Sequence, residues 1–336
     1  MLSKDAAGHW NAGANAAAGL PAAAQAAELV RLAARLLRLK SRLKFGDVGL
    51  GQARAAHVPA ATLNATGHGA RQASARNEFD ALQEFAVVLI SEIQQAIDRD
   101  AFCYFYQPIV GASSGIVEGY EALMRWRRGA QTVAPALFLP IAEETGSLGT
   151  MQQRLLDDVA KAWVQLAPPA FVSINWSPRQ FLKASAASAL IDRVKELKID
   201  PKRIVIEITA RSTVIDPDLV YFCIVLLKET GFQIALDDFG GNYGSLSYLS
   251  RLPIDLIKLD GSLTADLGQS ERAAETLAAV VDFAHKLGHR VVAKGVETPP
   301  QAAALRRLGC DFLQGHFIGS PARDLSDADR VIEFND

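Results

Sequence analysis

The chain has 336 residues, which is more than one ordinary domain needs and enough for one α/β barrel with an appendage. Hydrophobic residues make up 49% and charged residues 21%, as in an average globular protein. Because 35 basic residues stand against 37 acidic ones, the net charge is −2, which argues against a protein that binds nucleic-acid polymers through a basic surface.

The cysteines and the apolar runs indicate the cellular compartment in which we expect the protein. Cys103, Cys223 and Cys310 are widely spaced and form no CxxC pair, so we expect neither a disulfide framework nor a thiolate zinc site. No apolar run reaches the roughly 18 residues of a membrane span. The N-terminus also lacks the basic start and compact apolar core of a signal peptide. We therefore expect a soluble, cytoplasmic protein.

Residues 1–85 differ in composition from the rest and predict a low-complexity, partly disordered extension before one domain over residues 86–336. Within the extension, leucines at helical spacing and six Arg or Lys residues predict a basic amphipathic helix over about 26–45. One interpretation is a helix that docks on a membrane surface or a partner. The interpretation we favour is a linker helix with a solvated charged face.

From about residue 85, apolar runs of strand length alternate with helical segments. The helical segments are 150–166, 184–197, 217–230, 271–287 and 300–308. The strands are 102–110, 116–126, 170–176, 203–209, 233–238, 255–260, 290–295 and 311–317. This alternation favours a TIM-like (β/α)8 barrel. The first two strands are separated only by Gly111–Gly115, too short for a parallel crossover, so the first strand should be antiparallel.

Polar side chains gather where these strands end, the place where barrels of this type build their sites. They are Glu121, Asn175, Glu207, Asp237, Asp238, Lys258, Lys294 and Gln314. Carboxylates with one amide are the oxygen ligands that Mg²⁺ or Mn²⁺ prefers. Adjacent aspartates can bridge two such ions about 4 Å apart, as in phosphodiester cleavage. Any one of these residues could instead face solvent or form an ordinary ion pair, but together they predict one site.

Eight short motifs follow one another through this region. They are Tyr106–Val110, Glu121–Trp126, Ser173–Ser177, Ile206–Thr209, Asp237–Gly240, Ile257–Asp260, Gly295–Thr298 and Gln314–Gly315. With these motifs, residues from about 86 to 325 resemble the EAL-domain family of cyclic di-GMP phosphodiesterases. The resemblance implies a barrel that opens cyclic di-GMP to a linear dinucleotide by two-metal hydrolysis.

The resemblance also implies roles for individual residues. The first metal would be held by Glu121, Asn175, Glu207 and Asp237. The second would be shared by Asp237 and Asp238, and Lys258 would orient or polarise the attacking water, so that Lys258 and Glu121 form the catalytic core. The positions that match ligand contacts are Gln107, Leu123, Arg125 and Gln314, of which Arg125 would pair with a phosphate.

The chain departs from the family pattern at Lys294, where active members carry the Glu that ligates the second metal. An ammonium about 4 Å from a divalent ion is repelled by roughly 8 kcal/mol at an effective dielectric of about 20. We therefore expect Mg²⁺ or Mn²⁺ at the first site at most, with the second metal lost. Ala210 replaces a Glu that steadies the loop over residues 240–245, and that loop also differs. The alternative is a neutral loop change with Lys294 turned to solvent.

Three functions follow from these departures. The one we favour is a receptor that binds cyclic di-GMP with little or no hydrolysis and acts on a protein partner, which could be a protein of another sequence or a second copy of the chain. The second is a working, slow Mg²⁺- or Mn²⁺-dependent phosphodiesterase. The third is an interaction module that no longer binds the nucleotide; the retained carboxylates argue against it, because without a ligand they would only destabilise the fold.

Overall fold

The computed structural model describes residues 2–4, 10–12, 86–166, 168–182, 184–209, 216–241, 251–267, 270–325, 332 and 334. The basic helix predicted over 26–45 lies outside this range. Two short strands, β1 (Leu2–Lys4) and β2 (Trp10–Ala12), pair antiparallel. The chain forms two compact units, one of residues 1–101 with 126–148 and one of residues 102–125 with 149–336. The boundary expected near residue 85 stays a prediction.

In the first unit, a helix covers residues 86–98. The end of β4 (Val117–Arg128) pairs antiparallel with β5 (Gln131–Val133), and the short helices η1 (Pro135–Leu137) and α3 (Leu139–Glu144) follow. The rings of Trp126 and Phe138 meet edge to face at 6.0 Å. Sequence analysis missed β5 and α3, because both are shorter than the window over which periodicity becomes visible.

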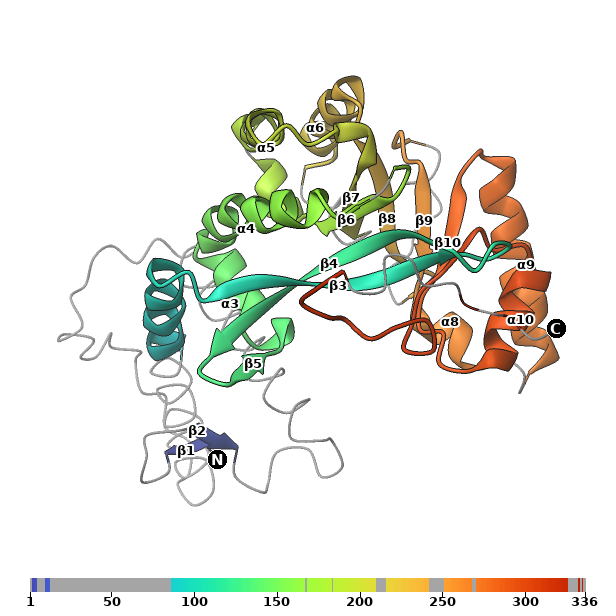
Figure 1. Ribbon diagram of the computed structural model, residues 1–336, viewed down its shortest axis with the longest axis horizontal. Helices are drawn as coiled ribbons and strands as arrows, with labels where there is room; N and C mark the ends of the chain where they lie inside the picture. Colours follow the sequence, from blue (N-terminus) through green and yellow to red (C-terminus); the bar gives the residue numbers. More distant parts are fainter. Residues whose placement is uncertain are drawn as a thin grey trace, which may run out of the picture. The chain divides into compact units, whose positions relative to one another are not determined.

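The second unit is a closed barrel of eight strands (Figure 1). In the order β3-β11-β10-β9-β8-β7-β6-β4, each strand pairs with the next, and β3 also pairs with β4. The successive pairs from β11 through β10, β9, β8, β7 and β6 to β4 are parallel, whereas β11 and β3 are antiparallel, so the predicted barrel and its antiparallel first strand are confirmed. The strands are β3 (Phe102–Gly111), β4 (Val117–Arg128), β6 (Phe171–Asn175), β7 (Ile204–Thr209), β8 (Gln233–Phe239), β9 (Leu256–Leu259), β10 (Arg290–Ala293) and β11 (Phe312–Leu313).

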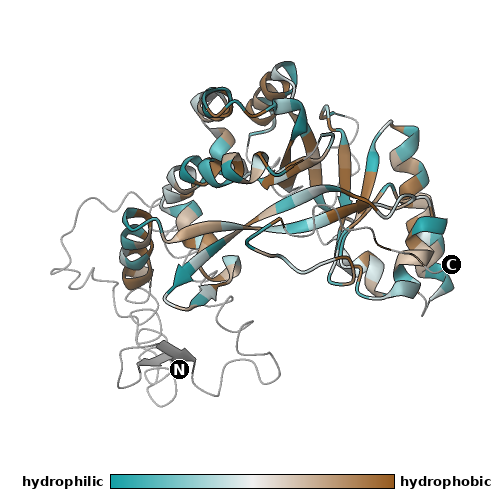
Figure 2. Cartoon of the chain, viewed as in Figure 1, coloured by the Kyte–Doolittle hydropathy of each residue, from teal (hydrophilic) through white to brown (hydrophobic). Residues whose placement is uncertain are grey.

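Helices lie outside the barrel strands (Figure 1). Figure 2 shows the inner strands as largely hydrophobic, whereas the helices also carry hydrophilic residues. Polar side chains cap two of these helices: Asp216 caps α6 (Pro217–Thr230), and Thr298 with Gln301 forms a capping box on α10 (Pro299–Arg307). The helices of this unit are α4 (Ser147–Trp163), η2 (Pro178–Leu182), α5 (Ala184–Glu196), η3 (Pro201–Arg203), α6 (Pro217–Thr230), α8 (Gly261–Ala265), α9 (Glu271–Lys286) and α10 (Pro299–Arg307).

The floor of the barrel is an apolar layer to which seven strands each give one side chain. The rings of Phe171 and Phe312 meet edge to face at 5.9 Å within this layer. A Cβ on Gly119 would lie 2.6 Å from the Phe171 ring, so only glycine leaves room for that ring. The layer consists of Ile109, Phe171, Val205, Ala235, Leu256, Val292 and Phe312. It seals one end of the barrel, and the polar residues at the strand ends lie at the other.

Candidate functional site

The centre of the site is a buried lysine between two buried glutamates. Lys258 on β9 places Nζ 2.7 Å from Glu121 Oε2 on β4 and 2.5 Å from Glu207 Oε1 on β7. These side chains are no more than 9% exposed. Because the strands that carry them are parallel, their carboxyl ends meet at one mouth of the barrel, as the sequence predicted.

Burial and charge set the protonation of this centre. Burial alone would raise the pKa of Glu121, but the Lys258 charge and hydrogen bonds from Lys258 and Gln314 outweigh it and hold the pKa at about 2. Burial raises the pKa of Glu207 to about 8, and the nearby Glu121 charge adds to the rise. The Lys258 ammonium therefore keeps Glu121 ionised but offsets only part of the cost of ionising Glu207. A further cation beside Glu207 would be needed to keep it ionised at neutral pH.

Amide side chains surround the same Glu121 carboxylate. Asn175 at the end of β6 donates from Nδ2 to Glu121 Oε1 at 2.8 Å. Gln314, directly after β11, donates from Nε2 to Glu121 Oε2 at 2.8 Å and lies 3.2 Å from Gln107 Oε1. Gln107 itself donates to the Gly319 carbonyl at 3.2 Å. Two of the predicted ligand-contact residues, Gln107 and Gln314, are thus joined to the predicted metal ligands in one network.

Lys294, directly after β10, also lies at this mouth of the barrel. Its Nζ lies 2.6 Å from Asp237 Oδ1 and 2.5 Å from Asp238 Oδ1. The Lys294 side chain is 20% exposed, so it does not turn to solvent. Burial alone would lower the pKa of its ammonium, but the Asp237 charge and the hydrogen bonds to both aspartates raise it above the ordinary lysine value. Lys294 is therefore charged throughout the physiological pH range.

The backbone around Lys294 fixes this position. The residue follows the end of β10, where the strand had been expected to continue through Gly295; Gly295 instead has φ +71°, which breaks extended geometry. The hydroxyl of the fully buried Thr264 donates to the Lys294 carbonyl at 2.7 Å. Asp238, which lies in β8, also has a positive φ, of 54°. Its carboxylate accepts a hydrogen bond from the Lys294 ammonium.

The side chains at the mouth fit the first of the two expected metals and do not fit the second. Glu121, Asn175, Glu207 and Asp237 offer oxygen atoms of the kind a hard divalent ion takes, and the buried Glu207 Oε2 has no hydrogen-bond partner among the described residues. These groups therefore fit a first metal. Asp237 and Asp238 each give an oxygen to the Lys294 ammonium, so a second metal shared between these two oxygens does not fit. Within the described ranges, no ready-made cluster of three or more His, Cys, Asp or Glu side chains surrounds one point.

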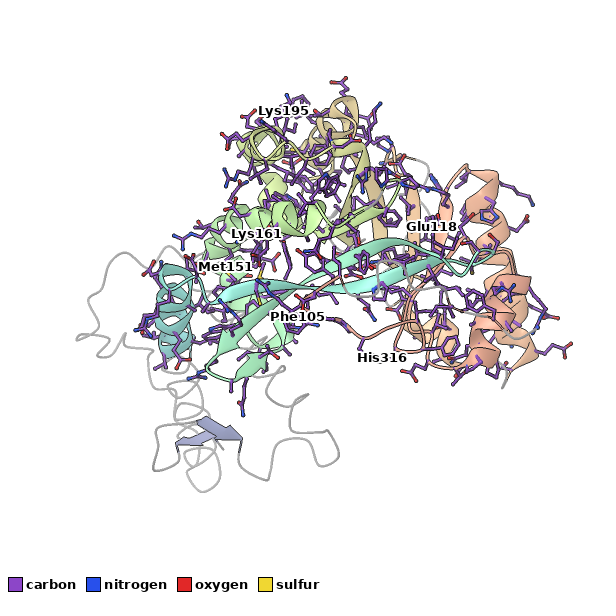
Figure 3. All side chains as sticks on the ribbon, viewed as in Figure 1. Phe105, Glu118, Met151, Lys161, Lys195 and His316 are labelled. Carbon is purple, nitrogen blue, oxygen red and sulfur yellow. The ribbon has the colours of Figure 1, made fainter. Side chains whose placement is uncertain are left out.

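Arg125 and Leu123 lie on β4 at two-residue intervals from Glu121, so all three side chains leave the strand on the same face. Arg125 is half-buried, and its guanidinium lies 5.7 Å from the centroid of the Phe105 ring on β3, which Figure 3 labels. Its hydrogen bond goes to the Met124 carbonyl at 2.9 Å. The guanidinium thus keeps donors for an anion. The other predicted departures, Ala210 and loop residues 242–245, lie outside the described part of the chain.

Gln152 and Gln180 form a hydrogen-bonded pair beside Asn175, here called the glutamine clamp, which was not predicted from the sequence. Gln152 on α4 is 4% exposed and donates to the Asn175 carbonyl at 2.6 Å. Its own Oε1 accepts from Gln180, whose Oε1 accepts from the Ser177 amide at 2.9 Å. The clamp fixes the turn that follows β6. The one sequence signal was an uncharged polar residue at a helix position where the spacing of Met151 and Leu155 predicts an apolar side chain.

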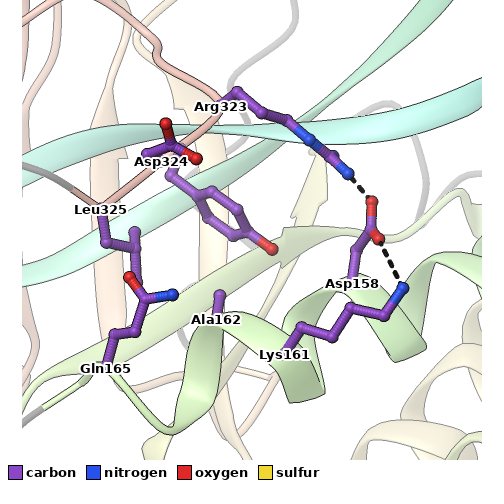
Figure 4. Close-up of a pocket in the computed structure, with 8 residues that line it drawn as sticks. Asp158, Lys161, Ala162, Gln165, Arg323, Asp324 and Leu325 are labelled. Atoms are coloured by element: carbon purple, nitrogen blue, oxygen red, sulfur yellow. Dashed lines mark hydrogen bonds and ion pairs between the residues drawn. The ribbon is translucent and has the colours of Figure 1, made fainter.

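A separate hollow of about 130 Å³ lies on the outer side of β3 (Figure 4). Arg323 donates to Asp158 on α4 at 2.8 Å and to the Tyr104 carbonyl at 3.0 Å, and Lys161 lies 3.5 Å from the same carboxylate. Asp158 and its partners join the segment after β11 to α4 and β3. None of the site residues named above lines this hollow.

The chain matches the EAL domain family over residues 90–321. It is 32% identical to the bifunctional diguanylate cyclase/cyclic di-GMP phosphodiesterase MucR of Pseudomonas aeruginosa, over 69% of this chain and 35% of MucR. It is 33% identical to the probable cyclic di-GMP phosphodiesterase PdeG of Escherichia coli, over 68% of this chain and 46% of PdeG. The chain thus spans less than half the length of these relatives.

Solved structures show the same barrel. The MucR phosphodiesterase in complex with cyclic di-GMP is 31% identical with a TM-score of 0.65, covering 70% of this chain and 97% of that one. An EAL domain protein of Listeria monocytogenes is 32% identical with a TM-score of 0.64, covering 69% and 93%. Among the described residues, no helix is long and apolar enough to cross a membrane. From the motifs, the closed barrel and these matches, the chain belongs to the EAL domain family.

Proposed function

We propose that this EAL domain binds cyclic di-GMP with little or no hydrolysis and acts as a receptor. The observation that carries the proposal is the Lys294 ammonium bound to both Asp237 and Asp238. Phosphodiesterases of the EAL family depend in general on divalent metals. An ammonium that holds both aspartates takes the oxygen atoms with which Asp237 and Asp238 would hold a second metal.

The ligand-contact groups support binding. Gln314 is hydrogen-bonded to Gln107 and to Glu121, Arg125 leaves β4 on the same face as Glu121, and the MucR structure carries cyclic di-GMP in a barrel of the same fold. Arg125 is suited to a charge-assisted contact with one phosphate. Leu123, two residues before it, would pack against the ligand. Binding would act on a protein partner, either another chain or a second copy of this one.

Mg²⁺ or Mn²⁺ at the first site would be held by Glu121, Asn175, Glu207 and Asp237. When bound, such an ion supplies charge that polarises a phosphate oxygen. This chain's own contribution there is Lys258, which holds Glu121 and Glu207 in place through its two short ion pairs. The same intact pairs favour the second candidate function, a slow phosphodiesterase that turns over with one metal.

Calorimetric titration of cyclic di-GMP into the full chain with Mg²⁺ present tests the proposal. We expect micromolar or tighter affinity, about −8 kcal/mol or more, with heats that return to baseline after each injection. A sustained heat flow that Glu121→Ala abolishes would instead identify the slow phosphodiesterase. No heat at all at about a hundred micromolar ligand would leave the interaction module.

A further inference from the structure

We propose that Lys294 is a built-in cation of the nucleotide site, which makes binding of the anionic ligand independent of a divalent metal and gives one N–H donor to a ligand phosphate. The inference rests on the proposed function and adds to it the charge that recognises the ligand. It starts from the disagreement between the residues present and a second metal.

Lys294 Nζ bridges carboxylates of two successive residues at 2.6 and 2.5 Å, which is what an ion shared by Asp237 and Asp238 would do. An ammonium has three N–H donors, and Lys294 uses two of them within the part of the chain that the structure describes. With 20% of its side chain exposed, the third donor can meet a ligand that enters the mouth.

Four carboxylates, Glu121, Glu207, Asp237 and Asp238, face two ammonium groups, Lys258 and Lys294, so the centre carries −2 when all four carboxylates are ionised. With an acid at position 294 the centre would carry −4, and a ligand with two phosphodiester groups would meet strong repulsion unless metal ions were added. The lysine thus supplies permanently, as part of the chain, charge that a metal supplies only when bound.

The segment that carries Lys294 is held rigidly. Thr264 holds the Lys294 carbonyl, and a Cβ on Gly295 would lie 3.1 Å from the Gly261 backbone, so the segment that carries the lysine is packed tightly against α8. Lys258 lies deeper, at most 2% exposed, and its ammonium is bound by Glu121 and Glu207. Of these two lysines, Lys294 is the one that a ligand can reach.

The test is a calorimetric titration of cyclic di-GMP into the full chain, once with EDTA and once with Mg²⁺. The affinity should agree within about twofold between the two conditions. Lys294→Met, which keeps the length but removes the charge, should lose about tenfold or more in EDTA and recover part of the loss with Mg²⁺. Lys294→Arg should bind in EDTA, and Lys286→Met, at a lysine on α9 that is 72% exposed, should match the wild type.

Binding by the wild type only when Mg²⁺ is present would overturn the inference and leave the receptor function standing. Absence of binding under both conditions would overturn the receptor function itself and this inference with it. The wild-type comparison needs no variant, so a variant that fails to fold does not affect it. As a second readout, Lys294→Glu should bind more Mn²⁺ by electron paramagnetic resonance than the wild type; equal Mn²⁺ binding would contradict the proposed role.

Discussion

Lys258 Nζ lies 2.5 Å from Glu207 Oε1, and neither side chain is more than 2% exposed. Either charge would be costly to bury alone, and the pairing offsets part of that cost. The same lysine also pairs with Glu121, so a single ammonium links β4 to β7 through their glutamates.

Removal of this cation should destabilise the barrel strongly. Lys258→Met leaves two buried carboxylates without their partner, and we expect a loss of about 3–5 kcal/mol in the free energy of unfolding. Urea denaturation followed by circular dichroism measures it. Lys286→Met, which removes an exposed lysine, should change stability by about 0.5 kcal/mol at most. A Lys258→Met protein as stable as this control would show that the pairs contribute nothing.

Glu207 should make stability depend on pH. Its pKa is raised from 4.5 to about 8, so the folded protein binds a proton that the unfolded chain releases between these values. The stabilisation is therefore complete below about pH 4.5 and is lost as pH rises through 8, with a slope of up to about 1.4 kcal/mol per pH unit. Urea titrations in EDTA at several pH values should show this slope in the wild type and a smaller one in Glu207→Gln. Parallel profiles would contradict the assignment.

The glutamine clamp should position Asn175. Gln152→Leu preserves volume but leaves the Asn175 carbonyl and the Gln180 amide without their partner, at a cost of about 1–3 kcal/mol. Because Asn175 then holds Glu121 less firmly, affinity for cyclic di-GMP should also fall, and Gln152→Glu, which has no N–H donor for the Asn175 carbonyl, should not restore it. The matched control is Gln153→Leu on the same helix, which should alter neither quantity. Loss of stability with unchanged affinity would assign the clamp to folding alone.

The ion pair on the outer side of β3 should matter for stability and not for the ligand. Asp158 is 14% exposed and Arg323 is 45% exposed, so solvent screens the pair, and a double-mutant cycle with Asp158→Ala and Arg323→Ala should give about 1 kcal/mol of coupling (Figure 4). Cyclic di-GMP affinity should stay unchanged, because no ligand-contact residue lines this hollow. A large drop in affinity would link the outer hollow to the mouth.

Strand positions were predictable from this sequence because buried strands are continuous apolar runs, as β7 (Ile204–Thr209) illustrates. The meeting of Glu121, Glu207 and Lys258 was also predictable, since parallel strands bring their ends together. The contacts of Lys294 were not predictable, because they depend on the positive φ angles of Gly295 and Asp238, which leave little trace in the sequence. Gln152 escaped prediction because its partners are a distant carbonyl and a side chain of another helix.

The most direct test of the account is the fate of the nucleotide. Cyclic di-GMP is incubated with the full chain and Mg²⁺ or Mn²⁺, and the products are separated by chromatography beside Lys294→Glu and Glu121→Ala. We expect the wild type to return the cyclic dinucleotide intact and Lys294→Glu to form more of the linear product. Rapid linearisation by the wild type, abolished in Glu121→Ala, would contradict the receptor and establish a phosphodiesterase.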